Sequence, residues 1–232
     1  MTGPIPIETM YAGTPSPLGP RRITSAIVKS AVPGPWDITL VGLVGDTQAD
    51  MRHHGGPEKA LHHYAREHYA TWLDETPALA PTLATTPAFG ENISTFGMTE
   101  ATVCVGDIYR VGAVLVQVSQ GRQPCWKLNA RFAADDMAYR VQMTGRTGWY
   151  YRVLEGGRIM PGDAMTLVER PQPEWSLSRI CALLYHRTTA FDELAALAEL
   201  PELAESWRNL AGRRVKSRTV ESWNSRLEGD KT

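Results

Sequence analysis

Cysteine is scarce in this sequence of 232 residues, and its spacing excludes several kinds of protein. The three cysteines, Cys104, Cys125 and Cys181, are odd in number and form no C-x-x-C pair. A disulfide framework, a structural zinc site and a protein-bound iron–sulfur cluster all need more cysteines or closer spacing. The sequence therefore argues against all three uses of cysteine.

Long apolar runs and an excess of charge are also missing. No stretch of about 20 apolar residues occurs, and no basic segment followed by an apolar run opens the sequence. The 24 Lys and Arg residues nearly balance 25 Asp and Glu residues, so bulk electrostatics favours neither nucleic acids nor membrane surfaces as partners. With 43% hydrophobic residues the chain can bury a substantial core. We expect a soluble, cytoplasmic protein without a membrane partner.

The common catalytic motifs are absent as well. The sequence has no G-x-S-x-G nucleophile elbow, no Walker loop and no G-x-G-x-x-G loop. A Cys–His hydrolase with His54 as the base stays open, because a sequence does not show which residues lie close together.

Short runs rich in Val, Ile and Tyr, separated by turns that contain glycine, are typical of strands. Many short strands with regular turns predict a small barrel or a sandwich. The expected strands are Ile23–Val28, Ile38–Val44, Thr102–Val105, Ile108–Val111, Val114–Val118, Trp149–Leu154 and Ala164–Val168.

One helix is predicted among these strands and three more after them. Pro57 suits the first position of a helix over Glu58–Asp74. After Pro171 and Pro173 no strand-like run follows, and helical periodicity covers Leu177–Leu184, Phe191–Leu200 and Leu203–Arg214. We therefore predict a β-rich domain over residues 1–171 and a three-helix domain over residues 172–232.

The histidines cluster without forming a metal-binding pattern. Two ligands on one helix must be three or four residues apart, and His62, His63 and His68 on the expected helix are spaced by one, five and six. We interpret them as structural or surface residues. His54 precedes Gly55-Gly56-Pro57, where a glycine loop opening a helix can bind an anion, although turn geometry and capping explain the pattern about as well.

Cys125 differs from the other two cysteines. Cys104 and Cys181 lie in apolar surroundings and read as small buried hydrophobes. Cys125 follows a predicted strand and Pro124, and it lies within three residues of Arg122 and Lys127. Cations favour the thiolate, which binds metals or attacks electrophiles. A functional thiol and a chance buried cysteine both stay open on these grounds.

A set of motifs in a fixed order resembles the MOSC domain family, named after the C-terminal domain of molybdenum-cofactor sulfurases, and within it the YiiM subfamily. The resemblance covers roughly residues 10–225. Its motifs are Gly42-Leu43-Val44-Gly45-Asp46, His54-Gly55-Gly56-Pro57 running into Lys59-Ala60, Phe89-Gly90-Glu91-Asn92, Gly106-Asp107, the loop over 119–128 and Gly148-Trp149-Tyr150.

The resemblance implies an α+β fold that is mainly β, with a MOSC-type β-barrel, a helix inserted after the second strand region and a small C-terminal three-helix domain. It also implies the molybdenum cofactor, with Cys125 as the ligand to molybdenum, and the reduction of N-hydroxylated compounds such as hydroxylaminopurines and amidoximes, which removes mutagenic base analogues. His54 is the expected proton-handling residue. Expected cofactor contacts are Lys29, His54, Gly55, Asn92, Ser119, Arg122, Lys127 and Arg146.

The remaining expectations concern partners. No second redox centre is visible, so an external flavin or iron–sulfur reductase must supply electrons. A carrier of the cofactor or of sulfur is the alternative to a reductase. The C-terminal basic cluster from Arg208 to Arg218 suggests DNA contact, but residues 172–232 hold nine basic and nine acidic residues. We favour a solvated face, a partner-docking surface or a homodimer contact over nucleic acid.

Overall fold

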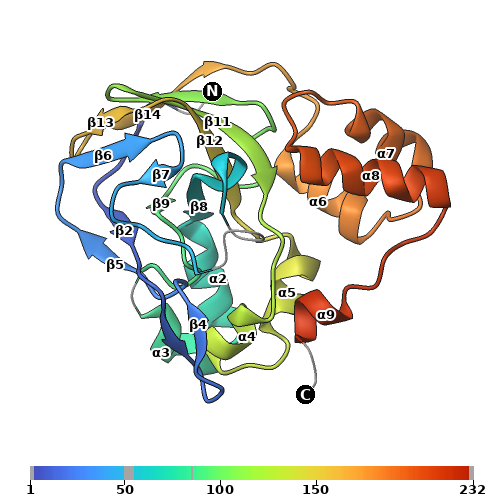
Figure 1. Ribbon diagram of the computed structural model, residues 1–232, viewed down its shortest axis with the longest axis horizontal. Coiled ribbons are helices and arrows are strands. Elements are labelled where there is room, and N and C mark those ends of the chain that lie inside the picture. Colours follow the sequence, from blue (N-terminus) through green and yellow to red (C-terminus); the bar gives the residue numbers. More distant parts are fainter. Residues whose placement is uncertain (1–2, 50–54, 85, 230–232) are drawn as a thin grey trace.

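The computed structural model describes residues 3–49, 55–84 and 86–229. A sheet-rich part and a group of C-terminal helices lie side by side, and the helices α2 to α5 lie on one side of the sheets (Figure 1). Among the described residues, no helix combines the length and the apolar character needed to cross a bilayer.

The main sheet has seven strands. Its order is β1-β14-β10-β11-β12-β8-β9, and every pairing is antiparallel except that of β8 with β9. The strands are β1 (Ile5–Pro6), β8 (Leu61–Ala65), β9 (Ile93–Thr95), β10 (Ile108–Val111), β11 (Val114–Gly121), β12 (Trp149–Glu155) and β14 (Ala164–Glu169).

Three small sheets complete a nearly closed barrel, which confirms the expected mainly β, α+β fold. They pair β13 with β6 and β7, β2 with β5, and β3 with β4. Their strands are β2 (Met10–Ala12), β3 (Ser16–Leu18), β4 (Ile23–Ser25), β5 (Ser30–Val32), β6 (Trp36–Thr39), β7 (Gly42–Leu43) and β13 (Gly157–Ile159).

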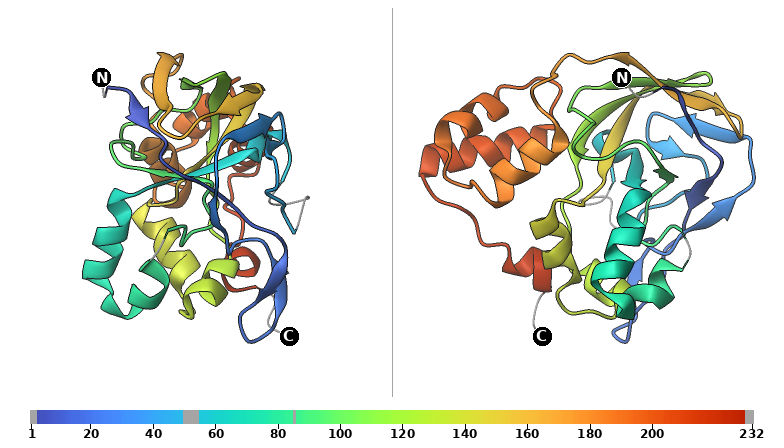
Figure 2. Two further views of the ribbon diagram at one scale, coloured as in Figure 1. Left: turned by 90° about the vertical axis from the view of Figure 1, so that its left-hand side faces the viewer. Right: turned by 180° about the vertical axis from the view of Figure 1, so that it is seen from behind.

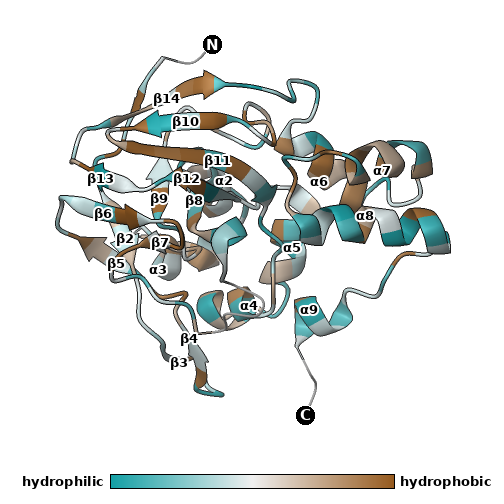
Figure 3. Ribbon diagram, turned by 45° about the horizontal axis from the view of Figure 1, so that its top comes forward, coloured by the Kyte–Doolittle hydropathy of each residue, from teal (hydrophilic) through white to brown (hydrophobic). Residues whose placement is uncertain are grey.

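Strand β11 shows how the sequence builds the barrel. Val114, Val116 and Val118 are buried and alternate with half-buried residues, so one face of the strand contributes to the apolar interior. From Val118 onward the strand is buried on both faces, because the C-terminal helices cover it there (Figure 3). A register shift between Val118 and Gln120 redirects the strand just before the Cys125 loop.

The helix expected over Glu58–Asp74 is partly wrong. A 3-10 turn, η1 (Pro57–Lys59), leads into strand β8, and helix α2 (Glu67–Glu75) begins only after it. The run from Leu61 to Ala65 has no β-branched residue, so its composition does not indicate a strand. Pairing with β12 and β9 decides its conformation and places it beside the edge strand β9 of the main sheet.

Other expectations also need correction. The stretch Ile38–Val44 is not one strand but contains the hairpin turn from β6 to β7, where Gly42 adopts a φ of +122°. Thr102–Val105 forms only an isolated bridge at Cys104. The short helices η2 (Pro77–Leu79), α3 (Ala80–Leu83), α4 (Lys127–Phe132), α5 (Met137–Thr144) and α9 (Asn224–Glu228) were not expected.

The three C-terminal helices agree with the expectation in type and order. They are α6 (Leu177–Tyr185), α7 (Phe191–Ala198) and α8 (Glu205–Ser217), and they share an apolar core of their own. Ser176 caps α6 by accepting a hydrogen bond from the Arg179 backbone N–H. Beyond α8 the chain returns past α5 and ends in α9 (Figure 2).

Candidate active site around Cys125

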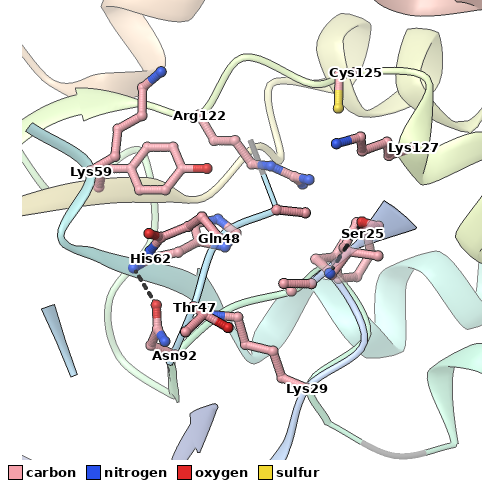
Figure 4. Close-up of a pocket in the computed structure, with 16 residues that line it drawn as sticks. Ser25, Lys29, Thr47, Gln48, Lys59, His62, Asn92, Arg122, Cys125 and Lys127 are labelled. Carbon is pink, nitrogen blue, oxygen red and sulfur yellow. Dashed lines mark hydrogen bonds between the residues drawn. The ribbon is translucent and has the colours of Figure 1, made fainter. Parts of the chain in front are cut away.

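A pocket opens beside the end of β11. Figure 4 shows its side chains, which come from segments far apart in the sequence. Its lining residues are Ser25, Ala26, Ile27, Lys29, Thr47, Gln48, Ala49, Lys59, His62, Phe89, Gly90, Asn92, Arg122, Cys125, Lys127 and Tyr150.

Cys125 lies between the end of β11 and the start of α4, and it is only 9% exposed. The backbone carbonyl of Cys125 accepts a hydrogen bond of 2.9 Å from the Leu128 N–H, which is part of the turn into α4. The sulfur points toward the same space as the cationic ends of Arg122 and Lys127 (Figure 4). The loop thus presents the thiol at the pocket wall.

The pocket is strongly cationic. Lys29, Lys59, Arg122 and Lys127 line it, and no carboxylate occurs among the described residues that do so. Clustered cations in a partly enclosed cleft raise the local concentration of anions. An anionic ligand is therefore the species that this pocket favours.

Arg122 is the most informative of these cations because it is buried and incompletely bonded. Its side chain shares a hydrogen bond with Tyr150, and its backbone N–H donates to Gly148 O at 2.9 Å. Its Nη1 atom, however, is buried and has no partner among the described residues. A buried polar group without a partner costs free energy, so this atom marks a place where a ligand would complete the hydrogen bonding.

Lys29 is held differently. Its ammonium donates to Asp46 Oδ2 at 2.6 Å, and both side chains are almost completely buried. Burial lowers the pKa of Lys29, and Asp46 opposes that shift. Asp46 also accepts from the Gly13 backbone N–H at 2.8 Å, so this carboxylate fixes Lys29 against the pocket wall.

Asn92 lines the pocket, but its amide is already used. Its Oδ1 accepts from the His62 backbone N–H at 3.0 Å, and its Nδ2 donates to Tyr11 O at 3.0 Å and to Asp46 Oδ2 at 2.8 Å. The amide therefore fixes the pocket wall through bonds within the chain. The left-handed residue of the turn before Asn92 is Gly90, with φ of +79°.

His62 was expected to be structural, yet it lines the pocket. Burial, together with the nearby charge of Arg122, lowers its pKa well below the usual range, so the imidazole is neutral near pH 7. Its Nε2 atom is buried and has no partner among the described residues. The next residue, His63, faces the other side of β8 and is fully bonded, to Tyr151 Oη at 3.1 Å and Thr95 Oγ1 at 2.9 Å.

Three expected cofactor contacts lie elsewhere or do not face the pocket. Ser119 is fully buried and donates to Glu58 O at 2.6 Å and to Tyr150 O at 3.1 Å. Arg146 pairs with Glu75 at 2.6 Å, and its guanidinium carbon lies 3.8 Å from the ring centroid of Trp72. Gly55 is not a lining residue.

The expected anion site at the start of a helix is also corrected. Pro57 begins a single 3-10 turn that runs into a strand, so no extended helix dipole points at the pocket. His54, expected to handle a proton, lies outside the described residues.

The sequence did not reveal Lys59, His62 and Tyr150 as pocket residues. Lys59 and His62 were assigned to a helix, where the spacing of His62 matched no metal pattern. Assigning β8 correctly would have pointed to them, because alternate residues of a strand face opposite sides. Tyr150, which alternates with buried Trp149 and Tyr151 in β12, carried the same signal.

The donor set of the pocket fits a metal-containing anionic cofactor. Within residues 3–49, 55–84 and 86–229, no group of three His, Cys, Asp or Glu residues is placed to hold a metal ion. Among the described residues, Cys125 is therefore not part of a ligand cluster, and a group bound in the pocket would have to bring further ligands for a metal. Arg122 Nη1 and His62 Nε2, which are buried without a partner among the described residues, could form hydrogen bonds to the polar atoms of such a group.

Comparison with known proteins agrees with this arrangement. Residues 50–166 match the MOSC domain, and residues 175–218 match the YiiM-like, 3-alpha helix domain. The chain is 41% identical over 210 residues to Protein YiiM of Escherichia coli strain K12, covering 90% of this chain and 93% of that protein. It is 40% identical over 197 residues to a protein of Gibberella moniliformis named Reductase, covering 84% of this chain but only 35% of that protein.

The structural comparison extends over both parts of the molecule. The crystal structure of YiiM from Escherichia coli aligns with a TM-score of 0.82 at 35% identity, covering 98% of this chain and 100% of that chain. A likeness of this extent includes the barrel and the C-terminal helices together. The chain therefore belongs to the MOSC domain family, in its YiiM subfamily with a C-terminal three-helix domain.

Proposed function

We propose that this chain is a molybdenum-cofactor-dependent reductase of N-hydroxylated compounds of the hydroxylaminopurine and amidoxime type. The observation that carries the proposal is the Cys125 thiol in one pocket with Arg122, whose Nη1 atom is buried without a partner among the described residues. The Cys125 thiol is a soft ligand for a metal, and the Arg122 guanidinium is a cation that can bind an anion.

The family supports this choice of cofactor. The MOSC domain family is associated with the molybdenum cofactor. The name Reductase of the Gibberella moniliformis protein supports an oxidoreductase activity, although this chain spans only about a third of that protein. Removal of mutagenic base analogues would be the physiological use of such an activity.

Each pocket residue has a role in this proposal. Cys125 supplies a thiolate ligand to molybdenum. Arg122 and Lys127 bind the anionic part of the cofactor, and Lys29 contributes a further positive charge from its fixed position beside Asp46. Asn92 holds the pocket wall by bonding to the backbone of His62 and Tyr11.

His62 takes the place that His54 had in the expectation from sequence. Its neutral imidazole can donate or accept one hydrogen bond at Nε2, which no described group of the chain uses. We assign it to hydrogen-bond the polar atoms of the cofactor or the substrate.

When bound, the cofactor supplies the two-electron cleavage of an N–O bond. The reaction takes one N-hydroxylated molecule, two electrons and two protons to the amine and one water. The electrons come from an external flavin or iron–sulfur reductase, in keeping with the absence of a cysteine set for a second redox centre in the sequence.

The test compares Cys125→Ala with the unchanged protein, both produced in a host that synthesises the cofactor. We expect molybdenum and pterin per chain to fall by at least about tenfold, because losing a metal ligand costs at least as much as the 10- to 100-fold typical of a group supporting a ligand. Cys104→Ser is the matched control, since Cys104 Sγ donates to Pro173 O at 3.5 Å and serine keeps a donor.

Turnover separates a reductase from a carrier. Loaded protein supplied with reduced methyl viologen should convert a hydroxylaminopurine to the aminopurine, and Cys125→Ala should not. Loading without any turnover would favour a carrier of the cofactor or of sulfur. Full loading and activity in Cys125→Ala would contradict the ligand role.

A further inference from the structure

The C-terminal helix α9 contacts the backbone on both sides of Cys125. The Arg226 guanidinium donates through Nη1 to the carbonyl of Pro124, the residue before the cysteine. The backbone carbonyl of the same Arg226 accepts a hydrogen bond of 2.8 Å from the N–H of Trp126, the residue after it. One residue of α9 therefore bonds to both neighbours of the proposed metal ligand.

Further contacts join α9 to the segment that follows the cysteine. The Asn129 side chain donates to Leu227 O at 2.9 Å, and Arg226 Nη2 donates to Gln142 Oε1 at 2.5 Å. Gly229, with φ of +76°, lies against the indole of Trp126, where an added Cβ would be 3.0 Å from Cδ2. The contacts cover α4 and α5 as well as the loop.

Helix α9 is itself anchored to the three-helix domain. Arg214 on α8 is buried and donates to both carboxylate oxygens of Glu221, at 3.0 and 2.6 Å, and to Leu184 O at 2.7 Å. The Trp223 Nε1–H also donates to Glu221, at 3.0 Å, and the Trp223 ring meets Tyr185 edge-on. The chain between α8 and α9 is therefore tied to α6 and α8.

The three-helix domain also contacts the strand that leads to Cys125. The Ala204 N–H, just before α8, donates to Ser119 O at 2.8 Å. A Cβ on Gly121 would lie 2.9 Å from the indole of Trp207, so only glycine permits this close packing. The C-terminal part thus meets the cysteine loop from β11 on one side and from α9 on the other.

We propose that residues 219–229 form a clamp that fixes the direction of the Cys125 thiol, with Arg226 as the positioning residue. This inference rests on the proposed function, in which Cys125 is a metal ligand, and it gives the C-terminal part a role in that site. With the peptide units on both sides bonded to Arg226, the main remaining freedom of the sulfur is rotation about the Cα–Cβ bond. Ligand groups need placement within about 0.5 Å, which a loop without such support does not provide.

The test is the rate at which iodoacetamide alkylates Cys125 in the full chain, produced in a host that cannot make the cofactor. In Arg226→Gln we expect the rate to rise about tenfold, because losing hydrogen bonds from a charged donor shifts the local opening of the loop by about that factor. The lost positive charge alone would slow the reaction, so a faster rate reports a more open loop. Arg213→Gln, at an exposed position of α8, is the matched control.

The other two cysteines report on the rest of the fold. Peptide mass analysis follows Cys104 and Cys181 in the same sample, and both are buried. Faster alkylation of Cys125 alone supports the clamp. An unchanged rate at Cys125, or an equal rise at all three thiols, would overturn it.

A conservative variant and the loaded protein complete the test. Arg226→Lys keeps one donor and the backbone carbonyl, so its alkylation rate should lie between those of the parent and Arg226→Gln; equal rates in both variants would overturn the role of the guanidinium. Loaded Arg226→Gln should release molybdenum faster than Arg213→Gln. Because alkylation is measured without cofactor, failure of the clamp is distinguishable from failure of the ligand role, which Cys125→Ala tests separately.

Discussion

The pocket and the helical part of the molecule each bury one arginine, and these two arginines are bonded in opposite ways. In the helical part, the buried Arg214 donates to Glu221 and Leu184 O, and Arg187 and Arg179 both pair with Glu193. In the pocket, Arg122 is as deeply buried, yet no described carboxylate forms an ion pair with it. Fractional exposure is 1% for Arg214 and 6% for Arg122, so burial alone does not explain the difference.

For these two arginines, the difference separates a cation that serves the fold from one that can bind a ligand. When all donors of a buried cation are hydrogen-bonded, these bonds offset the desolvation free energy of the charge, and the cation can stabilise the fold. A buried cation with an unused donor weakens the folded state and strengthens binding of an anion. Incompletely bonded buried charges of this kind are found at functional sites, where proteins give up some stability for function.

Replacing Arg122 is expected to have the largest effect on function. Arg122→Met should weaken cofactor retention about 100-fold, because a hydrogen-bonded buried charge pair with the anionic part would be lost. The free energy of unfolding of the cofactor-free chain should stay unchanged or rise by up to about 1 kcal/mol, since an incompletely bonded cation is removed.

Pterin release and urea unfolding measure these two quantities on the same variant. Arg187→Met is the control, because Arg187 is largely exposed and pairs with Glu193 far from the pocket residues. If Arg122→Met were destabilised and still retained the cofactor normally, Arg122 would serve the fold and not the ligand.

Arg214 should show the converse pattern. Arg214→Met should lower the free energy of unfolding by about 2 kcal/mol, because the Leu184 carbonyl loses its donor and Glu221 its partner. The loss is moderate because the Glu221 side chain is 40% exposed and can be hydrated. Urea unfolding of the cofactor-free chain measures it, and an unchanged midpoint would show that these bonds contribute nothing net.

Much of the barrel was predictable, because its strands carry β-branched residues in alternation. Ile108–Val111 was predicted with both ends correct, and the strands that begin at Val114 and Trp149 were found with errors only at their C-terminal ends. Strand β8 was missed because it has no β-branched residue and Tyr64 is its one residue with a strand preference, so its neighbours in the sheet determine its conformation. That single error also removed His62 from the predicted site.

The candidate site was predicted in part for a similar reason. Lys29, Asn92, Arg122, Cys125 and Lys127 were chosen and line one pocket. Ser119 and Arg146 were chosen by residue type, but Ser119 bonds to Glu58 O and Arg146 pairs with Glu75 and lies over Trp72, and a sequence does not show such partners. The bonds from Arg226 to Pro124 and Trp126 span about 100 residues of sequence, so no local pattern could indicate them.

His63 offers a smaller test, because it is a buried group whose bonding is complete while that of its neighbour His62 is not. Burial lowers the pKa of His63 to about 3, so the folded chain keeps it neutral while the unfolded chain protonates it below about pH 6.5. The contribution of neutral His63 to the free energy of unfolding is therefore fully present above pH 6.5. It is lost as the pH falls toward 3, at about 1.4 kcal/mol per pH unit. His63→Gln, which can still reach hydroxyl partners, should reduce the slope of unfolding free energy between about pH 4 and pH 6 by that amount. Equal slopes in urea titrations of variant and parent would show that His63 is protonated, or exposed, in the folded state.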